Sequence, residues 1–94
     1  MDAPGGIRRK PYNGEIVKTA NRVPIVEGLR VYTNNLDKGV ITLKDAEFEW
    51  NSVEGRYVLW FKVILDTKYN GDSIEGWDLQ SDDRVTTVFE GIKA

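Results

Sequence analysis

Residues 46–63 read AEFEWNSVEGRYVLWFKV, and this stretch decides the fold. Before the central SVEG, apolar and acidic residues alternate with the period of two that a half-buried β-strand shows. After it comes a run of β-branched and aromatic residues that favours a strand packed on both faces. SVEG ends in Gly55, which can adopt the left-handed backbone of a tight turn. The stretch therefore predicts a β-hairpin that turns at residues 52–55.

The same alternation predicts which side chains of the hairpin are buried. One face is expected to hold five core residues: Phe48, Trp50, Leu59, Phe61 and Val63. Trp77 and Phe89 are candidates to close this core. Trp60 falls on the opposite face with Val58 and Ile64. If the second strand is strongly bent, Trp60 also enters the core; if it is not, these residues form an exposed contact surface.

Outward from the hairpin, period-two segments continue in both directions. They are GLRVYT and GVITL before it, and EGWDLQ and DRVTTVFEG after it, separated by turn residues in NNLDKG, KD, YNGDS and SDD. Five or six short strands at intervals of about 8–12 residues indicate an all-β fold. We therefore expect a mostly β domain over residues 28–94, a small antiparallel barrel, because closure hides strand edges.

Two segments precede this domain. Residues 1–12 hold Pro4, Pro11 and a basic trio but little to bury, so we expect a flexible basic arm. Residues 13–27 fit either a short helix capped by Asn13 or an extended segment, because IVKTA suits both.

The stretch TNNLDKGV at residues 33–40 resembles a binding loop but fits a hairpin turn better. Asn34 and Asn35 tolerate left-handed backbone, Asp37 and Lys38 suit a solvated tip, and Gly39 could supply a positive φ. A calcium loop would need a bidentate Glu at its twelfth position, where Ala46 stands when Asn35 is the first. We expect no metal site.

Composition limits both the setting and the chemistry. The chain has 94 residues, enough for one domain, and neither cysteine nor histidine. Serine–histidine and cysteine nucleophiles and the common zinc sites are therefore excluded. The remaining catalytic options are carboxylate pairs, lysine or tyrosine. Asp78, Asp82 and Asp83 could supply a carboxylate pair, but small chains rarely form a substrate cleft. We expect a non-enzymatic protein without cofactors, placed in the cytoplasm because it shows no signal peptide or membrane-spanning run.

Charge is distributed unevenly along the chain. Residues 1–44 carry eight basic and four acidic side chains, whereas residues 45–94 carry five and eleven, which together give the net charge of −2. A basic arm beside a small barrel could bind single-stranded nucleic acid if Tyr12, Tyr32 or Tyr69 were exposed for stacking. The acidic body opposes this, since it repels phosphates.

Three groups of motifs suggest a family. PYN at 11–13 with IV at 16–17, TNNLDKG at 33–39 and DDRVT at 82–86 resemble segments of small uncharacterised proteins from actinobacteria and their phages. The resemblance spans residues 11–91 and implies a shape similar to SH3-like barrels of the KOW or Tudor type. Such barrels bind peptides or nucleic acids and seldom catalyse. The resemblance therefore implies an interaction role, such as that of a phage or accessory protein that acts on a host partner.

These observations favour a module that recognises another protein, through the arm and whichever aromatic residues are exposed. The candidate partner-binding residues are Arg8, Arg9, Lys10, Tyr32, Trp60 and Tyr69. Nucleic-acid binding through the arm is the first alternative, and homo-oligomerisation through an open strand edge is the second. The sequence is compatible with a monomer or a small homo-oligomer.

Overall fold

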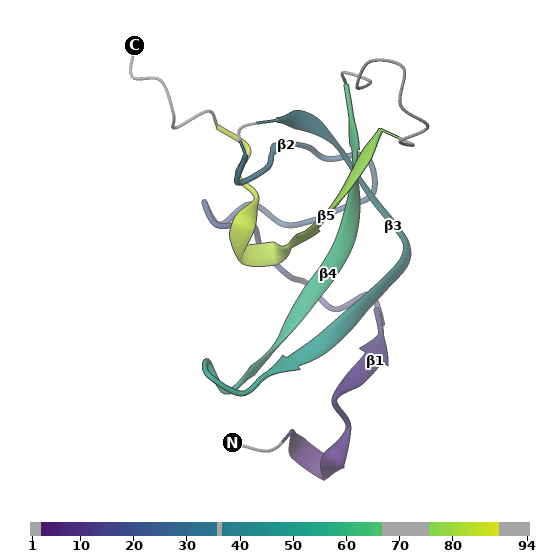
Figure 1. Ribbon diagram of the computed structural model, residues 1–94, viewed down its shortest axis with the longest axis vertical. Helices are drawn as coiled ribbons and strands as arrows, with labels where there is room; N and C mark the ends of the chain where they lie inside the picture. The colour runs from purple at the N-terminus through teal and green to yellow at the C-terminus, as the bar shows by residue number, and fades with distance from the viewer. Residues whose placement is uncertain (1–2, 36, 67–75, 89–94) are drawn as a thin grey trace.

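The fold is described from a computed structural model that covers residues 3–35, 37–66 and 76–88. Within these residues the chain is mostly β, in one antiparallel sheet, which confirms the expected fold class (Figure 1). The strands are β1 (Arg9–Pro11), β2 (Arg30–Tyr32), β3 (Lys38–Asn51), β4 (Arg56–Leu65) and β5 (Trp77–Ser81). Two short 3-10 turns, η1 (Pro4–Gly6) and η2 (Asp82–Arg84), lie before β1 and after β5.

The predicted hairpin is confirmed as the β3–β4 pair, the long twisted ribbon in the centre of Figure 1. Asn51 pairs with Arg56, so residues 52–55 form the turn, and Gly55 has the expected positive φ of 67°. Phe48 pairs with Leu59, and both side chains are buried. Local alternation and turn chemistry were sufficient to specify this element.

β3 contains an irregularity where the sequence suggests a separation between two strands. Thr42 pairs with Lys62 and Glu47 with Trp60, so residues 43–46 of β3 lie opposite Phe61 alone. Asp45 adopts a positive φ of 61° within this bulge. The expectation that KD at 44–45 separates two strands is therefore wrong, because the residues bulge without breaking the pairing with β4. The bulge also explains why core positions change from odd to even numbers along β3.

The bulge divides β3 into two halves with different neighbours. β2 pairs with the first half, with Val31 opposite Gly39, and β1 pairs with the second half, with Lys10 opposite Phe48. β5 pairs with β4 on the other side, so the sheet order is β1-β3-β4-β5, with β2 on the β1 side of β3. Arg9–Pro11 therefore form an edge strand, which corrects the expectation of a flexible arm for these three residues.

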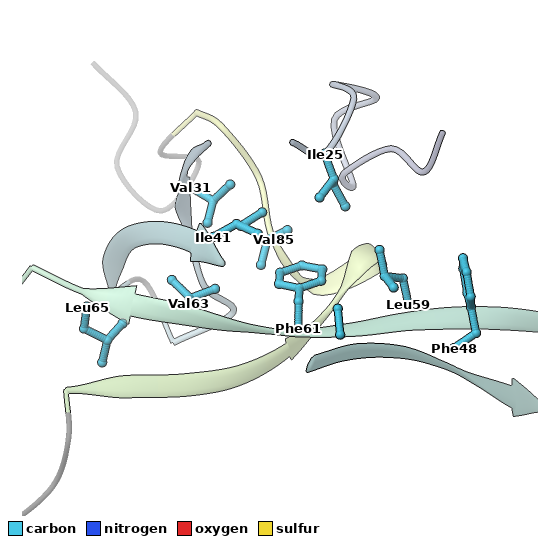
Figure 2. Close-up of a cluster of buried hydrophobic side chains, with 10 residues drawn as sticks. Ile25, Val31, Ile41, Phe48, Leu59, Phe61, Val63, Leu65 and Val85 are labelled. Carbon is cyan, nitrogen blue, oxygen red and sulfur yellow. The ribbon is translucent and has the colours of Figure 1, made fainter. Parts of the chain in front are cut away.

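The core lies on one side of the β3–β4 ribbon (Figure 2). Phe61 stands at its centre on β4, and Ile25 and Val85 approach it from the segments that cross this side of the sheet. The five core residues predicted on the hairpin are all buried, and all but Trp50 belong to this cluster. The cluster also contains Ile25, Val31, Ile41, Ala46, Leu65 and Val85. Trp77 is not part of it, because its pairing with Ile64 places it on the opposite face; Phe89 lies outside the described residues.

The segment at 13–27 is extended, which settles the open choice against a helix. Asn13 Oδ1 accepts a hydrogen bond from the Glu15 N–H at 3.0 Å, a turn contact two residues apart rather than a helix cap. Farther on, Lys18 bridges to Pro24, and the Ile25 N–H donates to the Val17 carbonyl. This narrow loop places the Ile25 side chain over the core.

The sheet does not close into a barrel over the described residues. After η2, the chain returns to β2 through an isolated pair, in which the Tyr32 and Thr86 backbones exchange hydrogen bonds of 2.7 and 3.1 Å. The strand expected at 83–91 is thus reduced to η2 and this bridge within the described part, which ends at Val88.

The TNNLDKGV stretch connects β2 to β3, as expected for a hairpin turn. The Thr33 N–H donates to the Asp37 carbonyl at 2.7 Å, and Thr33 Oγ1 accepts from the Asn35 and Asp37 N–H groups. The expected positive φ at Gly39 is wrong: a Cβ there would lie 2.1 Å from the Ile64 carbonyl oxygen. Glycine is required by the close approach of two backbones, not by its torsion angle.

Within the described residues, no helix has the length and apolar character that crossing a membrane would require.

Candidate binding surface on the outer face of the sheet

Side chains of β4 alternate between the core and the opposite side of the sheet, which we call the outer face. Phe61 is 1% exposed on the core side, whereas its neighbour Trp60 points to the outer face and is half-buried. On that face Trp60 lies beside Glu47 of β3 and Ser81 of β5. Trp60 therefore does not enter the core cluster, and the exposed surface expected with Val58 and Ile64 is only partly realised, because Val58 is buried whereas Ile64 is exposed.

Three adjoining hollows of about 270, 300 and 540 Å³ follow the outer face along β4. The first and second share Glu49 and Trp60, and the second and third share Lys44, Asp45 and Lys62. Because each hollow shares lining residues with the next, they form one elongated depression, which we call the outer groove. Its walls are the bulge of β3 on one side, and β5 with Arg84 on the other.

The outer groove has an apolar surface open to solvent. Leu79 is 51% exposed and Ile64 is 41% exposed, although both belong to regular strands. Trp60 is partly covered by Arg84, whose guanidinium carbon lies 5.4 Å from a Trp60 ring centroid. Lys62 similarly places its ammonium 4.5 Å from the Trp77 ring. Exposed apolar side chains gathered in a depression are typical of a contact surface.

The basic trio of the N-terminal segment is divided by β1 between two faces. Arg9 lies on the outer face and forms ion pairs with Glu47 at 2.6 Å and Glu49 at 3.7 Å. Lys10 points to the core side, where its ammonium lies 4.2 Å from the Tyr57 ring centroid. Arg8 is exposed, and its carbonyl accepts from the Trp50 N–H. The three cations therefore do not form a single positive patch.

The remaining sequence-predicted site residues lie elsewhere. Tyr32 is half-buried on β2, where its backbone pairs with Thr86, and it does not line the outer groove. Tyr69 lies outside the described residues. Of the six candidates, the structure brings Arg9 and Trp60 together at the outer groove.

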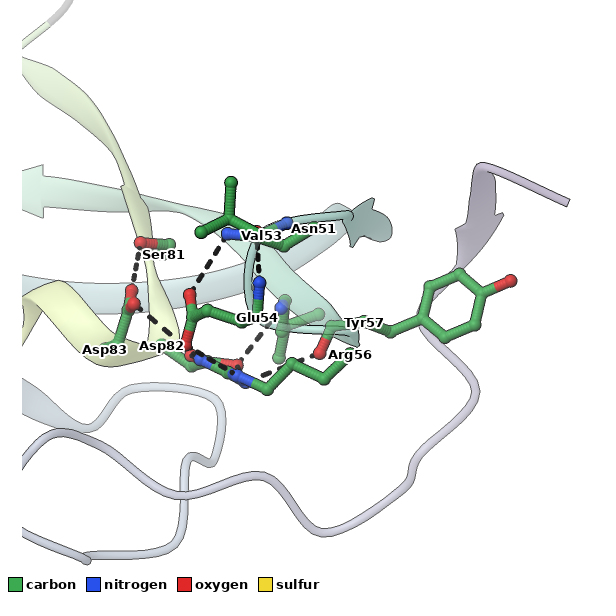
Figure 3. Close-up of polar contacts among 9 residues, drawn as sticks. Asn51, Val53, Glu54, Arg56, Tyr57, Ser81, Asp82 and Asp83 are labelled. Atoms are coloured by element: carbon green, nitrogen blue, oxygen red, sulfur yellow. Dashed lines mark hydrogen bonds and ion pairs between the residues drawn. The ribbon is translucent and has the colours of Figure 1, made fainter. Parts of the chain in front are cut away.

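An ion pair between half-buried Arg56 and buried Asp82 fixes the end of β5 (Figure 3). Asp82 is 3% exposed, and its carboxylate accepts from Arg56 at 3.1 and 3.4 Å and from the Leu59 N–H at 3.1 Å. Leu59 is the next β4 residue that would bond to β5 if that strand continued beyond Ser81, so the Asp82 side chain replaces a backbone carbonyl. The hydrogen bond to Asp82 raises the pKa of Arg56.

Each of the three carboxylates considered for catalysis has its own hydrogen-bond partner. Asp82 is engaged by Arg56 and Leu59, Asp83 accepts from Ser81 Oγ at 2.6 Å, and Asp78 accepts from Gln80 at 2.9 Å. No group of three carboxylates able to hold a metal ion occurs in the described part of the chain. The acidic residues near β5 therefore have identifiable structural contacts.

A second ion pair lies at the opposite end of the sheet, where Arg30 of β2 pairs with Asp66 after β4. The hydrogen bond with Asp66 raises the pKa of Arg30. Both groups are at the surface, so this pair helps to align strand ends and is not part of the outer groove.

Another hollow, of about 670 Å³, lies between the 16–22 segment and η2. Its lining includes Ile16, which is 77% exposed, and the Arg56–Asp82 pair. Basic side chains on the loop face acidic ones near the hairpin turn, so this hollow offers no excess of either charge. Position 16 is therefore an exposed control site that lies outside the outer groove.

The homo-oligomer alternative depends on an open strand edge. β5 is the last strand on its side of the sheet, but Gly76, Gln80 and Ser81 are already buried in the single chain. The accessible part of this edge is therefore short, which makes it a poor template for pairing with another chain.

Sequence reasoning placed Trp60 and Ile64 on one face but missed Lys44, Lys62, Leu79 and Arg84 as their neighbours. Lys62 was the available signal, because a lysine inside an apolar strand marks the side that faces water. Lys44 could not be placed without the bulge, nor Arg84 without η2.

No protein-family model, curated protein or solved structure matches this chain. The functional argument therefore rests on the geometry and charge of the described residues.

Proposed function

We propose that this chain is a non-enzymatic interaction module that binds another protein along the outer groove, with Trp60 as the central contact. The observation that carries the proposal is the continuous depression along β4 with solvent-exposed Leu79 and Ile64. A half-buried tryptophan held by an arginine is a rigid contact that loses little conformational entropy on binding, which is typical of interface hot spots.

The outer face also exposes apolar side chains that folding of the isolated chain does not require. The core side of β4 already buries Leu59, Phe61 and Val63 completely. Leaving Ile64 and Leu79 in water gives the isolated chain no stability, whereas covering them would contribute about 25 cal/mol per Å² of apolar area. Association with a partner supplies that cover.

The resemblance to SH3-like barrels remains part of this proposal. It is supported by the order of elements from β2 through β5 and η2, followed by the return of the chain to β2 at the Tyr32–Thr86 pair. Similar shape gives no partner, so the contact surface is argued from the outer groove alone.

Site-specific photocrosslinking tests the proposal. A benzoylphenylalanine at position 79, in the groove, is compared with one at position 16, which is also exposed but lines the separate hollow. In cells of the natural source, we expect a discrete protein adduct from position 79 that disappears when Trp60→Ala is added. An adduct from position 16 instead, or an adduct from 79 that survives Trp60→Ala, would contradict the proposal.

A further inference from the structure

The Asn13–Gly14 pair lies in the turn that leads from β1 into the segment that covers the core. Both residues are exposed, and Gly14 has a positive φ of 85°. A Cβ at Gly14 would meet no atom within 4 Å, so the space around its backbone is open. An asparagine followed by glycine is chemically labile in water, because no side chain shields the glycine nitrogen from the asparagine carboxamide.

Hydrogen bonds from Tyr12 hold this turn in place without covering it. The Tyr12 N–H donates to the Ala46 carbonyl at 3.0 Å, and the Tyr12 hydroxyl donates to the Glu15 carbonyl at 2.9 Å. These contacts lie on either side of the peptide bond between Asn13 and Gly14. Folding therefore fixes the backbone around that bond but leaves the bond itself at the surface.

The groups that would react in this pair are unhindered. Asn13 Oδ1 accepts its hydrogen bond from the Glu15 N–H, which folds the carboxamide back along the chain past the Gly14 nitrogen and draws electron density from Cγ. Within the described residues, neither the Gly14 N–H nor Asn13 Nδ2 donates a hydrogen bond. The attacking nitrogen and the departing amide therefore have no hydrogen bond to the protein to break.

We propose that Asn13 is a site of spontaneous deamidation in the folded protein, through a cyclic imide that yields isoaspartate as well as aspartate. The Gly14 nitrogen attacks Cγ of Asn13 and forms a carbon–nitrogen bond; the Cγ–Nδ2 bond breaks, and the proton of the Gly14 nitrogen leaves with the amide as ammonia. Water then adds to either carbonyl of the imide and opens the ring.

Isoaspartate at position 13 would change the backbone as well as the charge. The chain would run through the former side chain, which adds a methylene between Tyr12 and Glu15, and a carboxylate would replace a neutral amide. The segment that follows places Ile25 over the core, so the reaction alters the connection between β1 and this segment. The inference is independent of the proposed function, because position 13 does not line the outer groove.

Asn51 has the opposite environment in the same chain. It is half-buried, its Oδ1 accepts from the Val53 and Glu54 N–H groups at 3.0 Å each, and its Nδ2 donates to the Glu54 carboxylate at 3.0 Å. Ser52 follows it in place of a glycine. Asn51 is therefore an internal control, protected by its hydrogen bonds and by the side chain of the next residue.

The test is peptide mapping of the whole protein after incubation at neutral pH, folded or in guanidinium chloride. The tryptic fragment 10–18 contains Asn13 as its only asparagine, and the other Asn-Gly pair, Asn70–Gly71, falls in a separate fragment. Mass spectrometry follows the conversion of amide to acid, and enzymatic methylation of isoaspartyl groups identifies the product. We expect Asn13 of the folded protein to convert within about tenfold of its rate in the denatured chain, while Asn51 remains an amide.

Gly14→Ala is the matched variant, because its added methyl meets no other atom and the protein should stay folded. It should slow the conversion of Asn13 at least about tenfold, since a side chain then hinders the attacking nitrogen. Three results would overturn the inference: protection of Asn13 by folding beyond about tenfold, an unchanged rate in Gly14→Ala, or aspartate formed without isoaspartate. Conversion of Asn51 as fast as that of Asn13 would equally contradict it, because the local structure would then have no influence.

Discussion

The two faces of β4 differ although their residues alternate along one strand. Phe61 is 1% exposed against the core, and its neighbour Trp60 is half-buried on the outer face beneath Arg84. Val63 is completely buried, whereas Ile64 is 41% exposed. Residues of equal apolar character are therefore used in two ways, one side to hold the sheet together and the other to form a surface.

This difference teaches that hydrophobicity alone does not separate folding residues from binding residues. On the core side, apolar side chains contact one another from several segments of the chain. On the outer face, apolar side chains alternate with Lys62 and are bordered by the ion pairs of Arg9. Substitutions on the two faces should therefore affect different measurements.

The largest loss in the free energy of unfolding is expected from a substitution at the close contact that aligns β3 with β4. Gly39→Ala would place a Cβ 2.1 Å from the Ile64 carbonyl oxygen and 2.8 Å from its carbon, both in backbone. We expect a loss of about 4 kcal/mol or more in the free energy of unfolding, measured by urea denaturation, because neither strand can move away without losing its pairs.

Gly14→Ala is the control for this substitution. Gly14 has a positive φ of 85° but no atom within 4 Å of the added methyl, so only backbone strain remains, at about 1 kcal/mol. Equal losses for the two variants would show that the approach of β3 to β4 is not the constraint.

The next prediction compares the two faces directly. Phe61→Ala should cost about 3–5 kcal/mol, because it leaves a cavity in the centre of the core. Trp60→Ala should cost about 1–2 kcal/mol, since part of that side chain is already in contact with water. Urea unfolding of both variants gives the two free energies, and a larger loss for Trp60→Ala would reverse our assignment of the faces.

A smaller loss is expected from the ion pair at the end of β5. Asp82→Ala removes the acceptor for Arg56 and for the buried Leu59 N–H, and should lower the free energy of unfolding by about 2–3 kcal/mol. Asp83→Ala is the matched control, because that carboxylate is exposed and should change stability by less than about 1 kcal/mol. Thermal unfolding at neutral pH distinguishes the two; similar shifts would mean that Asp82 does not anchor β5.

The smallest effect should follow Arg9→Ala at the border of the outer face. Arg9 is 66% exposed, and its ion pairs with Glu47 and Glu49 are accessible to salt. We expect a loss of at most about 0.5 kcal/mol that vanishes in 1 M salt. A salt-independent loss above about 1 kcal/mol would indicate that Arg9 supports the fold, and the outer face would then be less distinct from the core.

The hairpin and its buried face could be predicted because their signals are local. Phe48 and Trp50 alternate with glutamates, and Gly55 marks the turn, so a short window of sequence is sufficient to predict the hairpin. The β3 bulge was not predictable in the same way. Lys44 and Asp45 have the composition of a turn, and only pairing with β4 decides that the strand continues through them.

The candidate site was less predictable because it depends on contacts distant in sequence. Trp60 could be assigned to a face by counting, but its burial depends on Arg84, twenty-four residues later in the numbering. The basic trio looked like one patch, yet pairing of β1 with β3 sends Arg9 and Lys10 to opposite faces. Charge clusters in sequence become charge clusters in space only when the local backbone keeps them on one side.

The most direct test of the account is the yield of the crosslink from position 79 in Trp60→Ala protein, relative to the same protein with Trp60 intact, at a temperature where both are folded. We predict that the partner adduct falls at least about tenfold while the variant still unfolds cooperatively. An adduct of unchanged yield would contradict the claim that the outer face of β4 is the surface with which this protein binds its partner.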